Sequence, residues 1–310
     1  MKKRRFLVSL ITKENDYQLE QANAAVETAR RLGADVEVVF AEGDPITQSQ
    51  QLLKTVQAPA DTHPDAIVLE PAGGTEFPHV AHAAVTAGIA WVVINREANY
   101  IADLRRVARS PIFCVSADHR EIGRIQGQHI VTLAPPEGTI VYIQGPSNSS
   151  VVKHRTSGMR ETKPAKTHVI TLRGQWTEES AYKAVCSWLL LSTSQKLPID
   201  MVVSQNDDMA VGARRAFQEW AGKTVKEKWL NLPFTGVDGL PRTGQEYVRR
   251  GTLAATVVVP PLTIPALETL ARAFQTGSQP PEIVLAAPTC FPPLEELARK
   301  RLSKAPTITS

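Results

Sequence analysis

Polar side chains follow two short apolar runs of the sequence, at the point where each run ends. Asn95 and Arg96 follow residues 91–94, and Asn206 comes three residues after the apolar stretch 201–203. Such runs predict buried strands, and ligands of an open α/β sheet bind past the carboxyl ends of its strands. An amide matches a hydroxyl, and a guanidinium grips two neighbouring hydroxyls or a carboxylate. The chemistry predicted is reversible binding of a small polar molecule.

Four further candidates stand in similar loops. Asn15 and Tyr17 lie in the first strand-to-helix loop, and Asp238 ends a predicted strand at 232–237. Arg155 closes a passage of small polar residues at 145–155. Each has a structural alternative: a turn Asn beside a core Tyr, a turn Asp before a glycine, and an Arg on a solvent-exposed helix face.

Trp176 precedes a predicted helix at 177–192. A large aromatic ring on a loop offers an apolar face to the C–H side of a sugar ring, or packs as a hydrophobic staple on Tyr182 or Val185. Asn206 has an alternative too, because an Asx turn at that point caps the following helix and binds nothing. Asp207 or Asp208 is the expected N-cap of that helix.

Enzymatic chemistry finds little support. The sequence has no G-x-S-x-G elbow, no H-E-x-x-H and no G-x-G-x-x-G after the first strand. The adjacent Asp207 and Asp208 point in different directions at a helix start, so they form no shared-proton dyad. His79 and His82 lack a third metal ligand, and three separated cysteines suit neither zinc nor a disulfide framework. We therefore predict no enzyme activity, no metal and no cofactor.

Strands and helices alternate along the chain, which predicts α/β architecture with parallel sheets and right-handed crossovers. The expected strands are 6–11, 35–40, 66–69, 90–94, 112–116, 139–143, 168–172, 201–203, 232–237, 254–258 and 283–286. The expected helices are 18–32, 47–56, 78–87, 118–132, 150–161, 177–192 and 262–273, and one further helix begins directly after Asn206. A chain of 310 residues is long enough for two such lobes.

Composition excludes several classes of protein. A 43% apolar and 21% charged sequence with net charge +4 is typical of a globular protein, and the basic cluster at 2–5 reads as a solvated tail that binds no nucleic acid. No apolar run approaches the ~20 residues that span a bilayer, so no membrane insertion is expected. Residues 6–11 are too short for the core of a signal peptide, so the sequence as given predicts a cytoplasmic protein unless a leader was removed.

The stretch SQNDDMAVGARRAF, residues 204–217, resembles the signature of sugar-binding proteins of bacterial ABC importers, of the ribose-binding type. The effector-binding core of lac-repressor-like regulators shares that fold. The resemblance covers about residues 6–286. It implies two doubly wound parallel-sheet lobes joined by a hinge, of the type I periplasmic-binding-protein kind. The lobes are expected at 1–117 with 260–281, and at 118–259 with 282–310.

The resemblance also implies roles for the candidates. In the family an Asp-Arg pair holds sugar hydroxyls where this chain has Asn95 and Arg96, and an amide is a weaker acceptor than a carboxylate. The R-x-x-G-M at 155–159 is similar to the family's R-x-x-G-F, and the G-V-D-G at 236–239 is similar to its G-x-D-G. Asn15 and Tyr17 match the family's Asn-x-(Phe/Tyr), and Trp176 stands where the family has an aromatic residue. Val259 departs from a common Gln and removes one expected hydrogen bond.

The sequence thus predicts a receptor that closes on a small polar ligand, a monosaccharide or related polyol, in a cleft between the lobes. Asn15, Tyr17, Asn95 and Arg96 are expected on one lobe. Arg155, Trp176, Asn206 and Asp238 are expected on the other. The partner implied is an ABC permease and the location the periplasm. The alternative is an intracellular ligand sensor or regulator core without a DNA-binding domain of its own.

Overall fold

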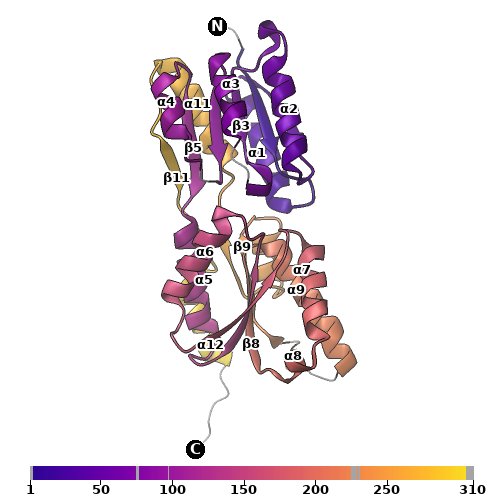
Figure 1. Ribbon diagram of the computed structural model, residues 1–310. Coiled ribbons are helices and arrows are strands. Elements are labelled where there is room, and N and C mark those ends of the chain that lie inside the picture. Colours follow the sequence, from indigo (N-terminus) through magenta and orange to yellow (C-terminus); the bar gives the residue numbers. More distant parts are fainter. Residues whose placement is uncertain (1–2, 75–76, 97, 225–228, 230, 305–310) are drawn as a thin grey trace, which may run out of the picture. The chain divides into compact units, whose positions relative to one another are not determined.

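The computed structural model describes residues 3–74, 77–96, 98–224, 229 and 231–304. The chain divides into two compact units. Unit 1 comprises Met1–Ala117 and Pro261–Ala286, and unit 2 comprises Asp118–Pro260 and Ala287–Ser310. Each is an α/β unit built on a six-stranded sheet (Figure 1). The predicted fold class is confirmed.

Unit 1 has a sheet in the order β11-β5-β4-β3-β1-β2, in which all neighbouring strands pair in parallel. Its strands are β1 (Arg5–Leu10), β2 (Asp35–Phe40), β3 (Ala66–Leu69), β4 (Ala90–Ile94), β5 (Ile112–Ala117) and β11 (Ile283–Ala286). Its α-helices are α1 (Asp16–Arg31), α2 (Pro45–Gln57), α3 (Pro78–Thr86), α4 (Ile101–Val107) and α11 (Thr263–Thr276), with short 3-10 turns η1 (Ala60–Thr62) and η2 (Ala72–Gly74).

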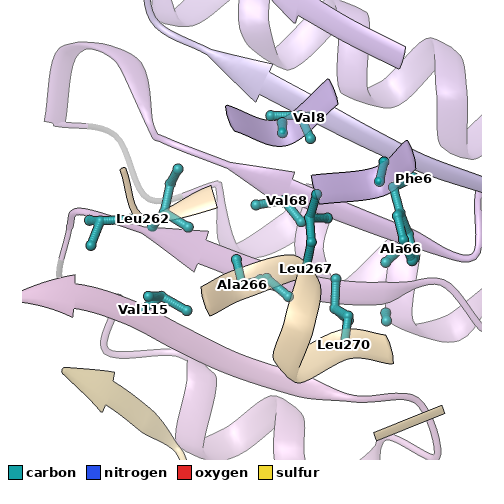
Figure 2. Close-up of a cluster of buried hydrophobic side chains, with 14 of the residues drawn as sticks. Phe6, Val8, Ala66, Val68, Val115, Leu262, Ala266, Leu267 and Leu270 are labelled. Carbon is teal, nitrogen blue, oxygen red and sulfur yellow. The ribbon is translucent and has the colours of Figure 1, made fainter. Parts of the chain in front are cut away.

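Apolar side chains alternate between the two faces of this sheet. Phe6 and Val8 face a cluster with Leu267 and Leu270 of α11 (Figure 2). Leu7 belongs to the cluster on the opposite face. This alternation follows from the two-residue period of a strand, and burial on both faces explains why the central strands β3 and β4 are continuous apolar runs. Two buried faces hold the carboxyl ends of the strands in fixed positions.

Unit 2 repeats the plan in the order β12-β10-β9-β8-β6-β7, parallel except for the antiparallel pair β10–β12. Its strands are β6 (Thr139–Gln144), β7 (His168–Arg173), β8 (Ile199–Ser204), β9 (Phe234–Asp238), β10 (Ala255–Val258) and β12 (Thr289–Phe291). Its helices are α5 (His119–Leu133), α6 (Ser150–Thr162), α7 (Glu178–Leu189), α8 (Ser192–Lys196), α9 (Asp207–Thr224), α10 (Gly244–Arg249) and α12 (Leu294–Lys304).

The structure differs from the sequence prediction at several places. Strand β11 pairs with β5, Ile283 opposite Cys114, so residues 282–286 belong to unit 1 and not to the C-terminal lobe. The helix expected at 177–192 ends at Leu189, and α8 follows it. Helix α4 was not predicted, because its seven residues are too short to show a period. Strand β12 and helix α12 were not predicted either, since β12 depends on a distant partner in the sequence, β10.

Two of the N-terminal basic residues that the structure describes are held by acidic partners. Lys3 lies 2.5 Å from Asp35, and Arg4 lies 2.6 Å from Asp65. No helix in the described part of the chain combines the length and apolar character that crossing a bilayer requires.

Candidate functional site

In unit 1, the candidate residues gather at the carboxyl ends of β1, β3 and β4, which are neighbours in the sheet. Asn95 and Arg96 follow β4 and are each 8% exposed. Asn15 and Tyr17 begin α1, just after β1, and are 6% and 5% exposed. We call these four residues, together with Glu70 at the end of β3, the first half-site.

Glu70 is the centre of this group, and sequence reasoning missed it. The carboxylate is 2% exposed and accepts hydrogen bonds from Gln18 Nε2 at 2.7 Å and from Asn95 Nδ2 at 2.8 Å. Arg96 Nη2 lies 4.0 Å from the same Oε1 that Asn95 contacts. A buried charge requires such partners. Glu70 thus joins Gln18, Asn95 and Arg96 in one network of side chains.

Asn15 has a structural role in this network. Its Oδ1 accepts a hydrogen bond from the backbone N–H of Gln18 at 3.1 Å and so caps α1. The cap fixes Gln18, whose side chain in turn reaches Glu70. The predicted alternative of a turn Asn is thus present.

In unit 2, the candidate residues gather at the ends of β6, β7, β8 and β9. We call Arg155, Trp176, Asn206 and Asp238 the second half-site. Arg155, on α6, is only 4% exposed, so the alternative of a solvent-exposed Arg is wrong. Its Nη1 donates to the backbone carbonyl of Gln205, and its guanidinium carbon lies 5.9 Å from the centre of the Trp176 ring.

Asn206 caps α9. Its Oδ1 accepts from the N–H of Met209 at 3.0 Å, so the expected cap by Asp207 or Asp208 is wrong. Its Nδ2 donates to the backbone carbonyl of Trp176 at 2.9 Å. The amide therefore joins the ends of β7 and β8, and retains one N–H and one oxygen lone pair for another partner.

Trp176 packs along the chain after β6. A Cβ added at Gly145 would collide with this ring, so the glycine leaves room for the ring in its present position. Trp176 and Tyr182 both pack against the apolar cluster that contains Val185. Staple packing of Trp176 on Tyr182 or Val185 stays a prediction. The indole is half-buried, with surface left for a second contact.

Asp238, 8% exposed, is held through its neighbours. The next residue, Gly239, donates its N–H to Asp207 Oδ2 at 2.8 Å, and Thr256 Oγ1 donates to Asp207 Oδ1 at 2.7 Å. Complete burial raises the pKa of Asp207 to about 8, and the nearby Asp208 charge adds to the rise. Val259, whose side chain is buried, donates its backbone N–H to the Asp238 carbonyl at 2.9 Å.

Three of the candidates have strained backbones. The described non-glycine residues with positive φ are Glu42, Phe77, Asn95, Trp176 and Asp238, and the last three stand at φ 61°, 66° and 111°. Such conformations are costly and concentrate at functional sites. Their coincidence with positions selected from sequence alone supports the assignment of both half-sites.

Sequence reasoning also missed Gln205. This residue is fully buried. Its Nε2 donates to the Tyr142 hydroxyl at 2.9 Å, and its Oε1 accepts from the Gly145 N–H at 3.1 Å. Its backbone carbonyl accepts a hydrogen bond from Arg155 Nη1. Its place beside Asn206 in the motif was the available signal. Within the described ranges, no three His, Cys, Asp or Glu side chains form a group able to hold a metal ion.

The periplasmic binding protein domain model matches residues 6–268 of this sequence. The chain belongs to the periplasmic binding protein family. It is 24% identical over 300 residues to the galactofuranose-binding protein YtfQ of Escherichia coli, covering 94% of this chain and 90% of that protein. It is 24% identical to the ribose import binding protein RbsB of the same species, covering 79% of this chain and 76% of that one.

Solved structures agree on the fold of this periplasmic binding protein. The crystal structure of a galactofuranose binding protein superposes with a TM-score of 0.80 at 22% identity, and the alignment covers 97% of this chain and 99% of that chain. The relatives and the solved structure are all named as binding proteins. The type I architecture predicted from the sequence is confirmed.

Proposed function

We propose that this chain is the receptor of an ABC-type transporter and binds a neutral polyhydroxylated molecule, a monosaccharide or related polyol. One observation carries the proposal. In each unit the polar residues selected from the sequence gather at the carboxyl ends of adjacent strands, and three of the candidates have a positive φ. The names of the relatives, which bind galactofuranose and ribose, favour a sugar.

The chemistry of the half-sites suits hydroxyl groups. Arg96 and Arg155 donate, Asp238 accepts, and the amides of Asn95 and Asn206 do both. Trp176 offers an apolar face to the C–H side of a ring. Several hydrogen bonds of about 0.5–1.5 kcal/mol each, with one aromatic face, suffice for micromolar affinity. A ligand that contacts both half-sites favours the closed conformation, because only that conformation allows both sets of contacts.

A thermal-shift screen tests the proposal. The panel contains D-ribose, L-arabinose, D-galactose, xylitol and myo-inositol, with glycine and L-serine as unrelated small ligands. Stabilisation by at least one sugar or polyol is expected, because a ligand that binds only the folded state raises Tm. No response to any of the five contradicts the sugar assignment, and a response to the amino acids alone replaces it.

The proposal extends to the fate of the ligand and to location. We expect the bound compound to be released unchanged, so NMR spectra of a ligand incubated with the protein should show no new product. We place the protein in the periplasm, with a permease as its partner. Recovery of the native protein in the osmotic-shock fraction checks the location, and its retention inside the cell would contradict it.

A further inference from the structure

Glu70 occupies a rigid position next to the ligand-binding candidates of unit 1. Its backbone N–H donates to the carbonyl of Ser9 on β1 at 2.9 Å, and its own carbonyl accepts from Gln48 Nε2 at 2.9 Å. Gln48 is fully buried and also accepts the N–H of Ala72 at 2.7 Å. The chain on either side of Glu70 is thus fixed, and the carboxylate has little freedom to move.

The Glu70 carboxylate determines which way the Asn95 amide faces. A carboxylate only accepts hydrogen bonds, so the group 2.8 Å from Oε1 must be the amino end of the Asn95 amide. The other Glu70 oxygen is engaged by Gln18 Nε2 at 2.7 Å, and Asn95 itself is held at φ 61°. The amide therefore cannot turn over without losing its bond to Glu70.

The opposite end of that amide is a hydrogen-bond acceptor, the oxygen Oδ1. Asn95 Oδ1 is buried and has no hydrogen-bond partner among the described residues. Buried polar atoms without partners are rare and costly, which makes them markers of ligand contacts. Beside it, Arg96 lies 4.0 Å from the Glu70 carboxylate, so the positive charge of Arg96 is balanced inside the protein.

We propose that Glu70 is a specificity-determining residue that makes Asn95 a hydrogen-bond acceptor and neutralises Arg96, so that the first half-site selects a ligand hydroxyl and rejects a carboxylate. The inference rests on the proposed function. A hydroxyl donates to Asn95 Oδ1 and accepts from Arg96. A carboxylate cannot donate to Oδ1, and it meets the negative charge of Glu70. The resemblance leads us to expect the carboxylate of an Asp at position 95. Glu70 orients the neutral Asn95 so that it presents an acceptor oxygen to the ligand, as that carboxylate would.

The experiment compares neutral sugars with their acids. Affinities of D-ribose and D-ribonate, and of D-galactose and D-galacturonate, are measured by calorimetry for the wild-type protein, Glu70→Gln and the control Glu268→Gln. Glu268 is partly exposed and pairs with Arg31 in the same unit. The wild type and the control should prefer the neutral member at least about tenfold.

In Glu70→Gln the preference should fall at least about tenfold, because the new amide can donate to Asn95 and turn its amino group outward. The double variant Glu70→Gln with Asn95→Asp should recover the preference, since the new carboxylate accepts from the new amide and still presents an oxygen to the ligand. Equal weakening of both ligands in Glu70→Gln, an unchanged ratio, or a double variant without recovery overturns the proposal.

A measurement without ligand separates this inference from the proposed function. In the wild type the Asn95 side-chain amide should give NMR resonances with slow hydrogen exchange, which shift and exchange faster in Glu70→Gln. If no sugar binds the wild type, the proposed function fails, and the NMR measurement still tests whether Asn95 donates a hydrogen bond to Glu70. Resonances that Glu70→Gln leaves unchanged overturn the inference, whatever the panel shows.

Discussion

The two half-sites are built from similar residue types and held in different ways. In unit 1, Gln18 and Asn95 bond to the side chain of Glu70. In unit 2, the side chains bond mainly to backbone: Arg155 to the Gln205 carbonyl, and Asn206 to the Trp176 carbonyl. Side-chain networks can be altered locally, whereas side chains that hold backbone also hold the fold. We therefore expect unit 1 residues to govern ligand choice and unit 2 residues to govern stability as well.

The largest effect should appear at Asp207 in unit 2. Its pKa is about 8 in the folded protein against 3.8 ordinarily, so the folded state retains a proton that the unfolded state releases between these values. The stabilising contribution is complete below the ordinary pKa of 3.8 and is lost as pH rises toward 8, at up to about 1.4 kcal/mol per pH unit. Denaturant unfolding across this range measures the slope.

Asp207→Asn provides the comparison, because an amide does not titrate here. The variant should lose the slope and stay within about 1 kcal/mol of the low-pH stability, since its amide oxygen can accept from the N–H of Gly239 and its amino group can donate to the hydroxyl oxygen of Thr256. A wild-type slope that survives in Asp207→Asn would show that other groups cause it.

The two Asn caps give a matched pair across the units. Asn206→Asp keeps the cap of α9 and loses the donor to the Trp176 carbonyl, so it should cost about 1–3 kcal/mol. Asn15→Asp keeps the cap of α1 and should change stability by less than about 0.5 kcal/mol. Denaturant midpoints measure both, and equal losses would contradict the difference between the half-sites.

Gly145→Ala should affect stability less than the loss of the Asn206 donor. The added methyl collides with the Trp176 ring, which is half-buried and can swing outward at a cost of about 1 kcal/mol. The expected results are a change in tryptophan fluorescence and a several-fold loss of sugar affinity. Unchanged fluorescence and affinity would remove Trp176 from the ligand contacts.

How much could be predicted from the sequence depends on how far apart the interacting residues are. Asn206 and Asn95 were found because each stands just after a predicted strand, so the local pattern is sufficient. Glu70, the residue after the predicted strand at 66–69, was missed because its partner Asn95 lies 25 positions further on. Strand β11 was placed in the wrong lobe for the same reason, since its partner β5 lies far earlier in the chain.

The α9 cap shows a different limit. Asn206, Asp207 and Asp208 are all good capping residues, so propensity alone could not choose among them. The choice follows from burial. The Asp207 carboxyl accepts hydrogen bonds from Gly239 and Thr256, which approach it only after the sheet has formed. Long-range contacts, rather than local preference, decide which of three suitable residues caps the helix.

The central claim is that residues of both units contact one ligand. Calorimetric affinities for the best sugar or polyol of the panel, measured with Arg96→Ala, Arg155→Ala and the control Arg106→Ala, test it most directly. Arg106 is exposed and pairs with Asp103 on α4. The account predicts at least about a tenfold loss for each of the first two variants and none for the control. Wild-type affinity in either Arg96→Ala or Arg155→Ala, with the variant folded, would contradict it.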